Sequence, residues 1–246
     1  DVWTEAGRLE APDAQPGDGF GAAMDADEGT MVSTSRTAAD GMGEAYVFTR
    51  SGSGDWTLAQ RLTASDAAEG DGYGVAVALD GDGLLVGAFA KGDTAGAVYA
   101  YRRDGSGKFV EEQVFQAEDT EVGDRFGVVM ALDGNRALIA ATRHSEQTGA
   151  AYLFERGSDG SWSQTAKLES DDAETGNRYG STLVLSEDRA FVGTGRYAGL
   201  TGTVFTFSRD PETGEWAEGA RLQPFDATRG MRFGSSAAFD GRELWV

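Results

Sequence analysis

The chain has 246 residues and a formal net charge of −20, from 41 acidic and 21 basic residues. Because a surface that follows phosphates needs an excess of Lys and Arg, this charge disfavours nucleic acid as a partner. The sequence contains no cysteine, which excludes disulfides and thiolate chemistry, and no apolar run that approaches the ~20 residues of a membrane span.

Short strands and tight turns are expected throughout, because 36 glycines accompany 40% hydrophobic and 10% aromatic residues. An aromatic residue followed by glycine recurs with spacings of 53, 53, 53 and 54 residues. The five pairs are Phe20-Gly21, Tyr73-Gly74, Phe126-Gly127, Tyr179-Gly180 and Phe233-Gly234. A fixed period of this length indicates a repeat architecture.

The second repeat shows the pattern of one unit. Its apolar runs predict four strands, at Tyr73–Asp80, Leu84–Phe89, Ala97–Arg102 and Phe109–Phe115. Glycines predict a tight turn after the first strand, at Gly81–Gly83, and a loop before the third, at Ala90–Gly96. In the fourth strand Phe109 and Phe115 are six residues apart, so a period of two places them on the same face.

Sheets with apolar residues on both faces must stack on their neighbours, which predicts an all-β fold, a β-propeller of four-stranded antiparallel blades with about 53 residues per repeat. We expect one domain over residues 1–246, with complete blades at 20–62, 73–115, 126–168 and 179–222. A fifth blade would combine residues 233–246 with 3–9. The sequence offers no third strand for it, which predicts a five-bladed ring with a gap or, as we favour, a segment of a longer propeller.

The run RLTASDAAEGDGYGVAVALDGDGLLVGAF, at Arg61–Phe89, followed by GAVYAYR, resembles the FG-GAP repeat. This repeat builds the propellers of integrin α subunits and of many bacterial extracellular proteins. The resemblance therefore implies an extracellular or cell-surface protein, with the periplasm as the alternative. It covers the whole chain, although the GAP half is present only as Gly87-Ala88-Phe89. Because one propeller scaffold hosts adhesion, sugar binding and catalysis, the function must be sought in particular side chains.

The resemblance also raises calcium as a cofactor, since integrin-type repeats often hold it in a DxDxDGxxD loop between the first two strands. Calcium takes about six to eight oxygen ligands, and the corresponding segments are too short to supply them. We interpret these segments as hairpin turns: Asp25–Gly29, Asp80–Gly83, Asp133–Arg136, Ser186–Arg189 and Asp240–Arg242. The alternative metal ligands are Asp18, Asp71 and Asp124, which would form an acidic rim around the central channel of the propeller. Two repeats have Asn177 and Met231 at this position instead.

Further charged residues follow the repeat. An aspartate lies seven residues before each aromatic-glycine pair, at Asp13, Asp66, Asp119, Asp172 and Asp226. We expect each to cap backbone N–H groups of its own turn, with a ring of cation sites as the alternative. Basic residues recur after the third strand and within the fourth, and we expect them to pair with the surplus acids rather than to bind anions. They are Arg50, Arg103, Arg156 and Arg209, and Arg8, Arg61, Lys167 and Arg221.

The segments between the second and third strands differ most among the repeats, and variable loops on a rigid scaffold commonly carry binding. Their cationic and aromatic residues are the candidate ligand-binding residues: Arg36, Lys91, Arg143, His144, Arg196 and Tyr197. Solvated loops without a ligand are the alternative. Replacing Arg143, His144, Arg196 and Tyr197 together is expected to abolish partner binding without lowering the melting temperature.

These features predict a secreted or surface-exposed module that binds a protein or a polysaccharide without catalysis. No motif supplies a nucleophile for the single histidine, His144, so we expect no enzyme. A polysaccharide-active enzyme, or its accessory propeller, is one alternative. An architectural subunit of an extracellular assembly is the other.

Overall fold

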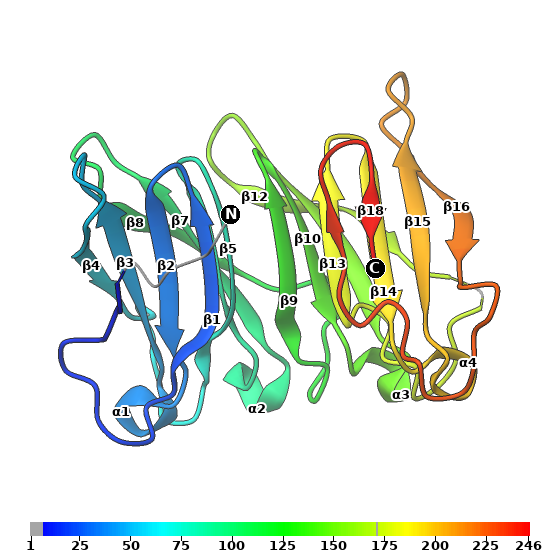
Figure 1. The fold of residues 1–246 in the computed structure, drawn as a ribbon, viewed down its shortest axis with the longest axis horizontal. Coiled ribbons are helices and arrows are strands. Elements are labelled where there is room, and N and C mark those ends of the chain that lie inside the picture. Colours follow the sequence, from blue (N-terminus) through cyan, green and yellow to red (C-terminus); the bar gives the residue numbers. More distant parts are fainter. Residues whose placement is uncertain (1–6, 171) are drawn as a thin grey trace.

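The computed structural model describes residues 7–170 and 172–246. Four antiparallel sheets of four strands stand side by side and are followed by a two-stranded hairpin (Figure 1). In each sheet the strands are hydrogen-bonded in the order of the sequence. The all-β fold and the four-stranded propeller blades predicted from the repeat are therefore confirmed.

Each blade carries a short helical turn between its second and third strands. Blade 1 consists of β1 (Phe20–Asp27), β2 (Thr30–Ser35), α1 (Ala38–Gly41), β3 (Glu44–Arg50) and β4 (Trp56–Leu62). Blade 2 consists of β5 (Tyr73–Asp80), β6 (Gly83–Ala88), α2 (Lys91–Thr94), β7 (Ala97–Arg103) and β8 (Phe109–Phe115).

Blade 3 consists of β9 (Phe126–Asp133), β10 (Arg136–Ala141), α3 (His144–Gln147), β11 (Ala150–Arg156) and β12 (Trp162–Leu168). Blade 4 consists of β13 (Thr182–Ser186), β14 (Arg189–Thr194), α4 (Tyr197–Leu200), β15 (Thr203–Arg209) and β16 (Trp216–Leu222). The hairpin is formed by β17 (Ala238–Phe239) and β18 (Leu244–Trp245).

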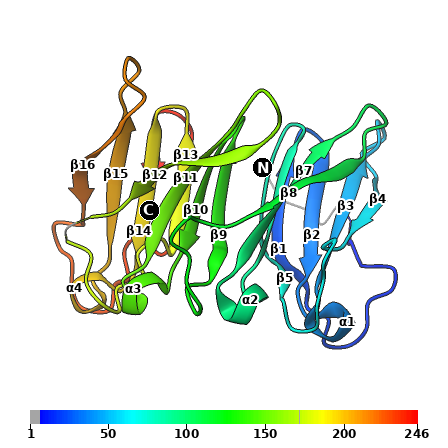
Figure 2. The same ribbon diagram turned by 180° about the vertical axis from the view of Figure 1, so that it is seen from behind.

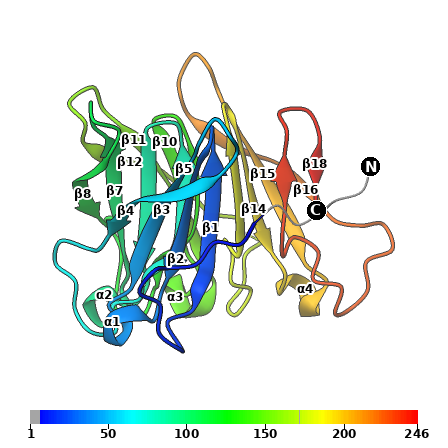
Figure 3. The same ribbon diagram turned by 60° about the vertical axis from the view of Figure 1, so that its left-hand side comes forward.

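The helical turns replace the loops that the sequence predicted. In α2, Gly92 and Asp93 have φ angles of 61° and 56°, so a left-handed turn is inserted into the segment. The Gly96 N–H closes it by donating to the Lys91 carbonyl at 3.0 Å. Seen from the front, from behind and from the side, α1–α4 lie along one edge of the sheets, which we call the turn face (Figures 1, 2 and 3).

The opposite edge carries the hairpin turns between the first and second strands. In blade 2, Asp80 pairs with Gly83, so two residues connect the strands, as predicted. The turn carboxylates are directed to the backbone of the next blade. Asp27 of blade 1 accepts a hydrogen bond from the Gly81 N–H at 2.8 Å, and Asp80 accepts one from the Gly134 N–H. These turns thus connect neighbouring blades.

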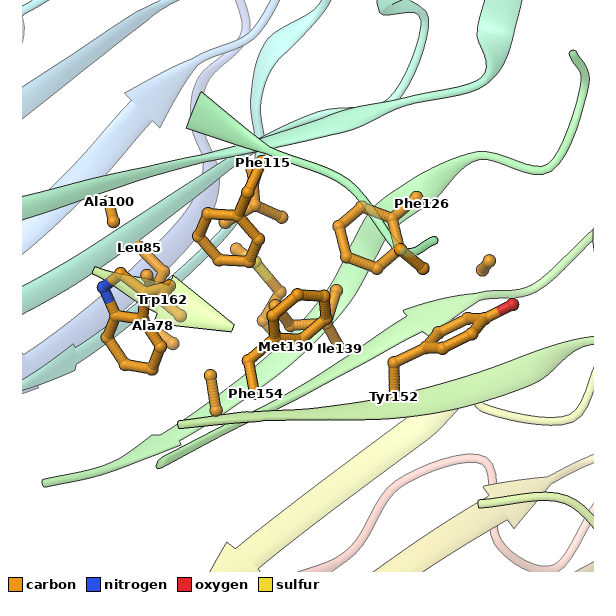
Figure 4. Packing of buried hydrophobic residues seen from close by; sticks show 14 of the residues in the cluster. Ala78, Leu85, Ala100, Phe115, Phe126, Met130, Ile139, Tyr152, Phe154 and Trp162 are labelled. Carbon is orange, nitrogen blue, oxygen red and sulfur yellow. The ribbon is translucent and has the colours of Figure 1, made fainter. Parts of the chain in front are cut away.

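Three hydrophobic clusters fill the interfaces between successive blades. Figure 4 shows the cluster between blades 2 and 3, in which aromatic rings of both blades meet. Phe115 of blade 2 stacks on Trp162 of blade 3, with ring centroids 6.1 Å apart. Burial of such rings from water is the main stabilising contribution to each interface.

A β-bulge in each fourth strand corrects one prediction. In blade 2 the register between β7 and β8 shifts between Ala100 and Tyr101, and the other blades have the same shift. One extra residue reverses the alternation of faces along the strand. Phe109 therefore packs between blades 1 and 2, whereas Phe115 packs between blades 2 and 3. The prediction that the two rings share a face is wrong.

Successive blades approach most closely at the aromatic-glycine pair. The Phe126 N–H donates to the Ala95 carbonyl of blade 2 at 2.8 Å, and the adjacent Gly96 has a φ of 90°. A Cβ on Gly96 would meet the backbone nitrogen and carbonyl oxygen of Phe126. Glycine is required here by both the positive φ and the contact between backbones. The repeated glycine before each third strand is therefore part of the scaffold.

The hairpin packs on blade 4, where the rings of Phe239 and Phe191 lie 5.0 Å apart. The strand expected over residues 3–9 falls mostly outside the described residues, and its pairing with the hairpin stays a prediction. Leu9, which is described, packs with Tyr46 and Phe48 of blade 1. Among the described residues, no helix has the length and apolar character that crossing a bilayer requires.

Candidate functional site

The turn face contains a polar network at the base of each blade, which we call the junction network. In blades 1 and 2 a tyrosine of the third strand donates to the aspartate that precedes the blade. The Tyr46 hydroxyl donates to Asp13 at 3.0 Å, and the Tyr99 hydroxyl donates to Asp66 at 2.6 Å. Blade 4 has Phe205 at this position, so its third strand offers no phenol hydroxyl to Asp172.

Protein cations complete the junction network. Arg61 pairs with Asp13, Lys167 pairs with Asp119 at 2.8 Å, and Arg221 pairs with Asp172. The prediction that the aspartates cap their own turns is wrong for Asp13, Asp66, Asp119 and Asp172, whose carboxylates are bound by phenol or cationic groups instead. For Asp226 it stays a prediction. The alternative prediction placed a ring of bound cations at these carboxylates. In the structure, Arg and Lys side chains of the protein lie there.

The basic residues that follow the third strands pair largely as predicted. Arg103 lies 3.5 Å from Asp82, Arg156 lies 2.7 Å from Glu112, and Arg209 lies 3.9 Å from Glu155. Arg50 departs from this pattern, since its Nε donates to the Gly54 carbonyl at 3.2 Å.

Three of the six candidate ligand-binding residues belong to the junction network. Lys91, His144 and Tyr197 each begin a helical turn and occupy equivalent positions in blades 2, 3 and 4. The Lys91 ammonium lies 3.0 Å from Asp66. His144 binds Asp124 through Nδ1 at 2.8 Å and Lys167 through Nε2 at 3.1 Å. The Tyr197 hydroxyl accepts from Arg221 at 2.7 Å. These side chains hold the turn to the blade.

The three candidate metal ligands also have structural partners. Asp18, Asp71 and Asp124 accept backbone N–H groups three residues earlier in the chain, at 2.6, 2.9 and 2.9 Å respectively. They make the turn caps that the sequence assigned to the other aspartates. Asp71 and Asp124 are buried, so they do not form an exposed rim. Within residues 7–170 and 172–246, no group of three or more His, Cys, Asp or Glu side chains is placed to hold a metal ion.

The junction network shifts the pKa values of its members. Burial raises the pKa of Tyr99 far above its usual range, and the hydrogen bond to Asp66 adds to this. The same hydrogen bond, with a smaller contribution from Lys91, lowers the pKa of Asp66. The network therefore favours ionised aspartate and neutral tyrosine.

The other three candidates, Arg36, Arg143 and Arg196, belong to a second set of side chains. With Arg125, Arg178 and Arg232 they form what we call the arginine cluster. Within the described part of the chain, none of the six guanidinium groups has a carboxylate within ion-pair distance. The Nε atoms of Arg125 and Arg178 are buried without a hydrogen-bond partner.

Mutual proximity distinguishes the arginine cluster from isolated surface charges. Burial lowers the pKa of Arg125, and the positive charges of Arg143, Arg178 and Arg36 lower it further. Burial likewise lowers the pKa of Arg178, with added contributions from Arg196 and Arg143. The cluster is thus a local concentration of positive charge in an acidic protein.

Sequence reasoning missed Arg125, Arg178 and Arg232, which directly precede three of the aromatic-glycine pairs. Their φ angles are 61°, 55° and 55°, and the equivalent residues of the first two repeats, Gly19 and Gly72, have φ of 68° and 65°. An arginine in this left-handed conformation is strained, and such strain concentrates at functional sites. The signal in the sequence was the replacement of glycine by arginine at one repeated position.

The comparison with protein families decides the relationship. The model of the FG-GAP repeat matches residues 3–48, 56–101 and 109–154, together more than half of the chain. The chain belongs to the FG-GAP repeat family. Its second and third matched FG-GAP segments each run from a fourth strand to the third strand of the following blade. The resemblance of the sequence to this family is therefore confirmed.

Two solved structures are similar to this FG-GAP protein in fold. A protein from Lactobacillus plantarum has 16% identity and a TM-score of 0.55, over 84% of this chain and 56% of its own. A functionally unknown protein from Desulfotomaculum acetoxidans DSM 771 has 15% identity and a TM-score of 0.54, over 87% of this chain and 60% of its own. The chain thus covers less than two thirds of either protein. A search of curated proteins gives no match.

Proposed function

We propose that this FG-GAP protein is a non-catalytic binding module outside the cell, and that it docks a polysaccharide on the turn face. The observation that carries the proposal is the arginine cluster, for which the described residues supply no carboxylate at ion-pair distance although the chain has 41 acidic residues. Where a protein leaves such charges unpaired at strained positions, a binding role offsets the cost in stability. The typical occurrence of FG-GAP repeats in extracellular proteins supports the location.

A polysaccharide suits the chemistry of this surface. Two members of the cluster contact the ring of Phe89, with the Arg36 Cζ 5.7 Å and the Arg125 Cζ 5.1 Å from its centroid. Planar guanidinium and aromatic groups offer flat faces to sugar rings and many donors to their oxygens. A protein partner, which the sequence also predicted, is the competing outcome.

The test is electrophoresis of the purified chain through gels that contain dextran, polygalacturonate or dextran sulfate. We expect at least one polymer to retard the wild type, and Arg36→Gln/Arg143→Gln/Arg196→Gln to migrate as in an empty gel. The double variant Arg50→Gln/Arg189→Gln is the control, because both residues are exposed and lie at strand ends on the opposite edge. The proposal would be overturned if the triple variant and the wild type were retarded equally, or if no polymer retarded the wild type.

The absence of catalysis is part of the same proposal. His144 has both ring nitrogens engaged, by Asp124 and by Lys167, and this supports a structural role for the only histidine of the chain. Incubation with the retained polymer should release no reducing ends. Turnover that is lost in Arg36→Gln/Arg143→Gln/Arg196→Gln would show an enzyme instead.

A further inference from the structure

A small recess lies at one end of the arginine cluster. Its volume is about 170 Å³, and three cationic residues line it, Arg178, Arg196 and Arg232, together with Ser181, Ser235 and Gly195. Arg178 precedes blade 4, Arg196 follows β14, and Arg232 precedes the hairpin, so three separate segments bring the cations together. Ligand pockets for drug-sized molecules are usually ~300–1,000 Å³. This recess therefore has room for one small group.

The two serines of the recess donate to backbone carbonyls, Ser181 to Gly193 and Ser235 to Arg232, whereas the guanidinium groups lack comparable partners within the described residues. The Nε of Arg178 is buried and has no hydrogen-bond partner. Within the described residues, the side chains of Arg196 and Arg232 have no carboxylate at ion-pair distance. A buried donor without a partner costs free energy, and the cost is greater when the group is charged. An acceptor with negative oxygens would satisfy these groups.

The shape of the recess depends on a glycine. A Cβ on Gly195 would meet the Ser235 hydroxyl and would lie 3.4 Å from the Arg232 Cβ. Gly195 therefore leaves space beside Ser235 and Arg232 in the lining of the recess. Arg178 and Arg232 reach the recess from left-handed backbone positions, with φ of 55° in each case. The glycine leaves space in the recess, and the two left-handed residues bring their guanidinium groups to it.

We propose that this recess binds an oxyanion, a sulfate, phosphate or carboxylate group, through the guanidinium groups of Arg178, Arg196 and Arg232. Guanidinium donors match such oxygens in pairs, and charge-assisted bonds of this kind are stronger than neutral ones. The oxyanion site does not depend on the proposed function. If a polysaccharide carries the oxyanion, the inference does rest on the proposed function, and the ligand is then an acidic polysaccharide whose acidic group enters the recess.

The net charge of −20 restricts how such a ligand is recognised. At long range the protein repels a polyanion, so binding must come from short-range contacts within the recess. Arg143 extends the positive surface from Arg178 towards blade 1, since its charge acts on both Arg178 and Arg125. A second acidic group of the same polymer would lie along this extension.

The test is isothermal titration calorimetry of the whole chain with inorganic sulfate and with inorganic phosphate, in chloride buffer of low ionic strength. We expect saturable binding to the wild type and affinity weaker by about tenfold or more in Arg178→Gln/Arg232→Gln, because two charge-assisted contacts are lost. Gly195→Ala, which keeps every charge, should also weaken binding. Arg50→Gln/Arg189→Gln removes the same charge from the opposite edge and should bind like the wild type.

The source of the group is distinguished by gel retardation with dextran sulfate. Retardation that Arg178→Gln/Arg232→Gln loses identifies a sulfated polymer, whereas sulfate binding without retardation identifies the free ion. Absence of saturable binding for both ions, or equal weakening in the control variant, overturns the oxyanion site. A wild type that neutral dextran retards but that binds neither ion would sink this inference alone and leave the proposed function standing.

Discussion

The junction network and the arginine cluster lie on the same face and begin at adjacent residues, yet they are built in opposite ways. His144 turns into the blade and binds Asp124 at 2.8 Å, whereas its neighbour Arg143 joins the cluster. In the junction network the aspartate before each of blades 1–4 has a cationic partner, supplied by a fourth strand in three blades and by Lys91 of a helical turn in blade 2. In the cluster the arginines recur in only some of the repeats, and among the described residues no carboxylate lies at ion-pair distance from them. The contrast separates charges that hold the scaffold through a partner from the charges to which the proposed function assigns binding.

The sharpest test of this contrast is Asp124→Ala. The carboxylate binds the His144 ring at 2.8 Å and the Glu121 N–H at 2.9 Å, and it is buried. The variant leaves the buried His144 ring and the Glu121 N–H without their common hydrogen-bond acceptor, and two such losses should cost about 3 kcal/mol together. We expect urea denaturation at pH 7 to show this loss.

Asp18→Ala is the matched control, because Asp18 occupies the equivalent position in blade 1. It accepts the Gln15 N–H at 2.6 Å and is half-buried. Loss of this one turn hydrogen bond should cost about 1 kcal/mol. Equal losses in the two variants would show that the histidine pair contributes nothing and would break the contrast.

A smaller effect is expected from Tyr99→Phe. The variant removes the hydroxyl that donates to Asp66 at 2.6 Å and keeps the ring in its core cluster. The expected loss is about 1–2 kcal/mol, since Lys91 still pairs with the carboxylate at 3.0 Å. Phe205 of blade 4 shows that the fold accommodates phenylalanine at this position. Thermal unfolding would measure the change, and an unchanged melting temperature would mean that the phenol adds no stability.

The pH dependence of stability tests the same junction through Asp66. Its pKa is lowered in the folded state, chiefly by the Tyr99 hydroxyl and then by Lys91. A lowered pKa contributes stability above the unfolded value, about 3.9 for aspartate, and that contribution disappears as the pH falls through the folded pKa. Asp66→Asn should therefore be less stable than the wild type at pH 7, and the difference should close at acidic pH. A difference that stays constant down to pH 3 would contradict the assignment.

The sequence predicted the scaffold well because the scaffold repeats. Strand positions followed from the period, and the glycine before each third strand followed from its recurrence. The bulge between Phe109 and Phe115 was hidden, because one extra residue leaves the sequence spacing unchanged while it exchanges the faces. Position in a loop placed all six candidate ligand-binding residues on the turn face, and a binding role for Arg36, Arg143 and Arg196 stays a prediction. It could not show that Lys91, His144 and Tyr197 pair with groups of the blade, because those partners come from distant parts of the sequence.

The smallest effect on stability is expected from Arg125→Gln/Arg178→Gln. Burial and neighbouring arginines lower the pKa of both guanidinium groups, so the fold disfavours their charged forms. Their removal relieves repulsion and gives up the contact of Arg125 with Phe89, whose ring centroid is 5.1 Å away. The two effects oppose each other, and we expect a net change within about 0.5 kcal/mol, typical of surface substitutions.

Added sulfate should raise the melting temperature of the wild type more than that of the variant, because a ligand stabilises only the state that binds it. A loss as large as that of Asp124→Ala would place the arginines in the scaffold and erase the distinction between the two sets.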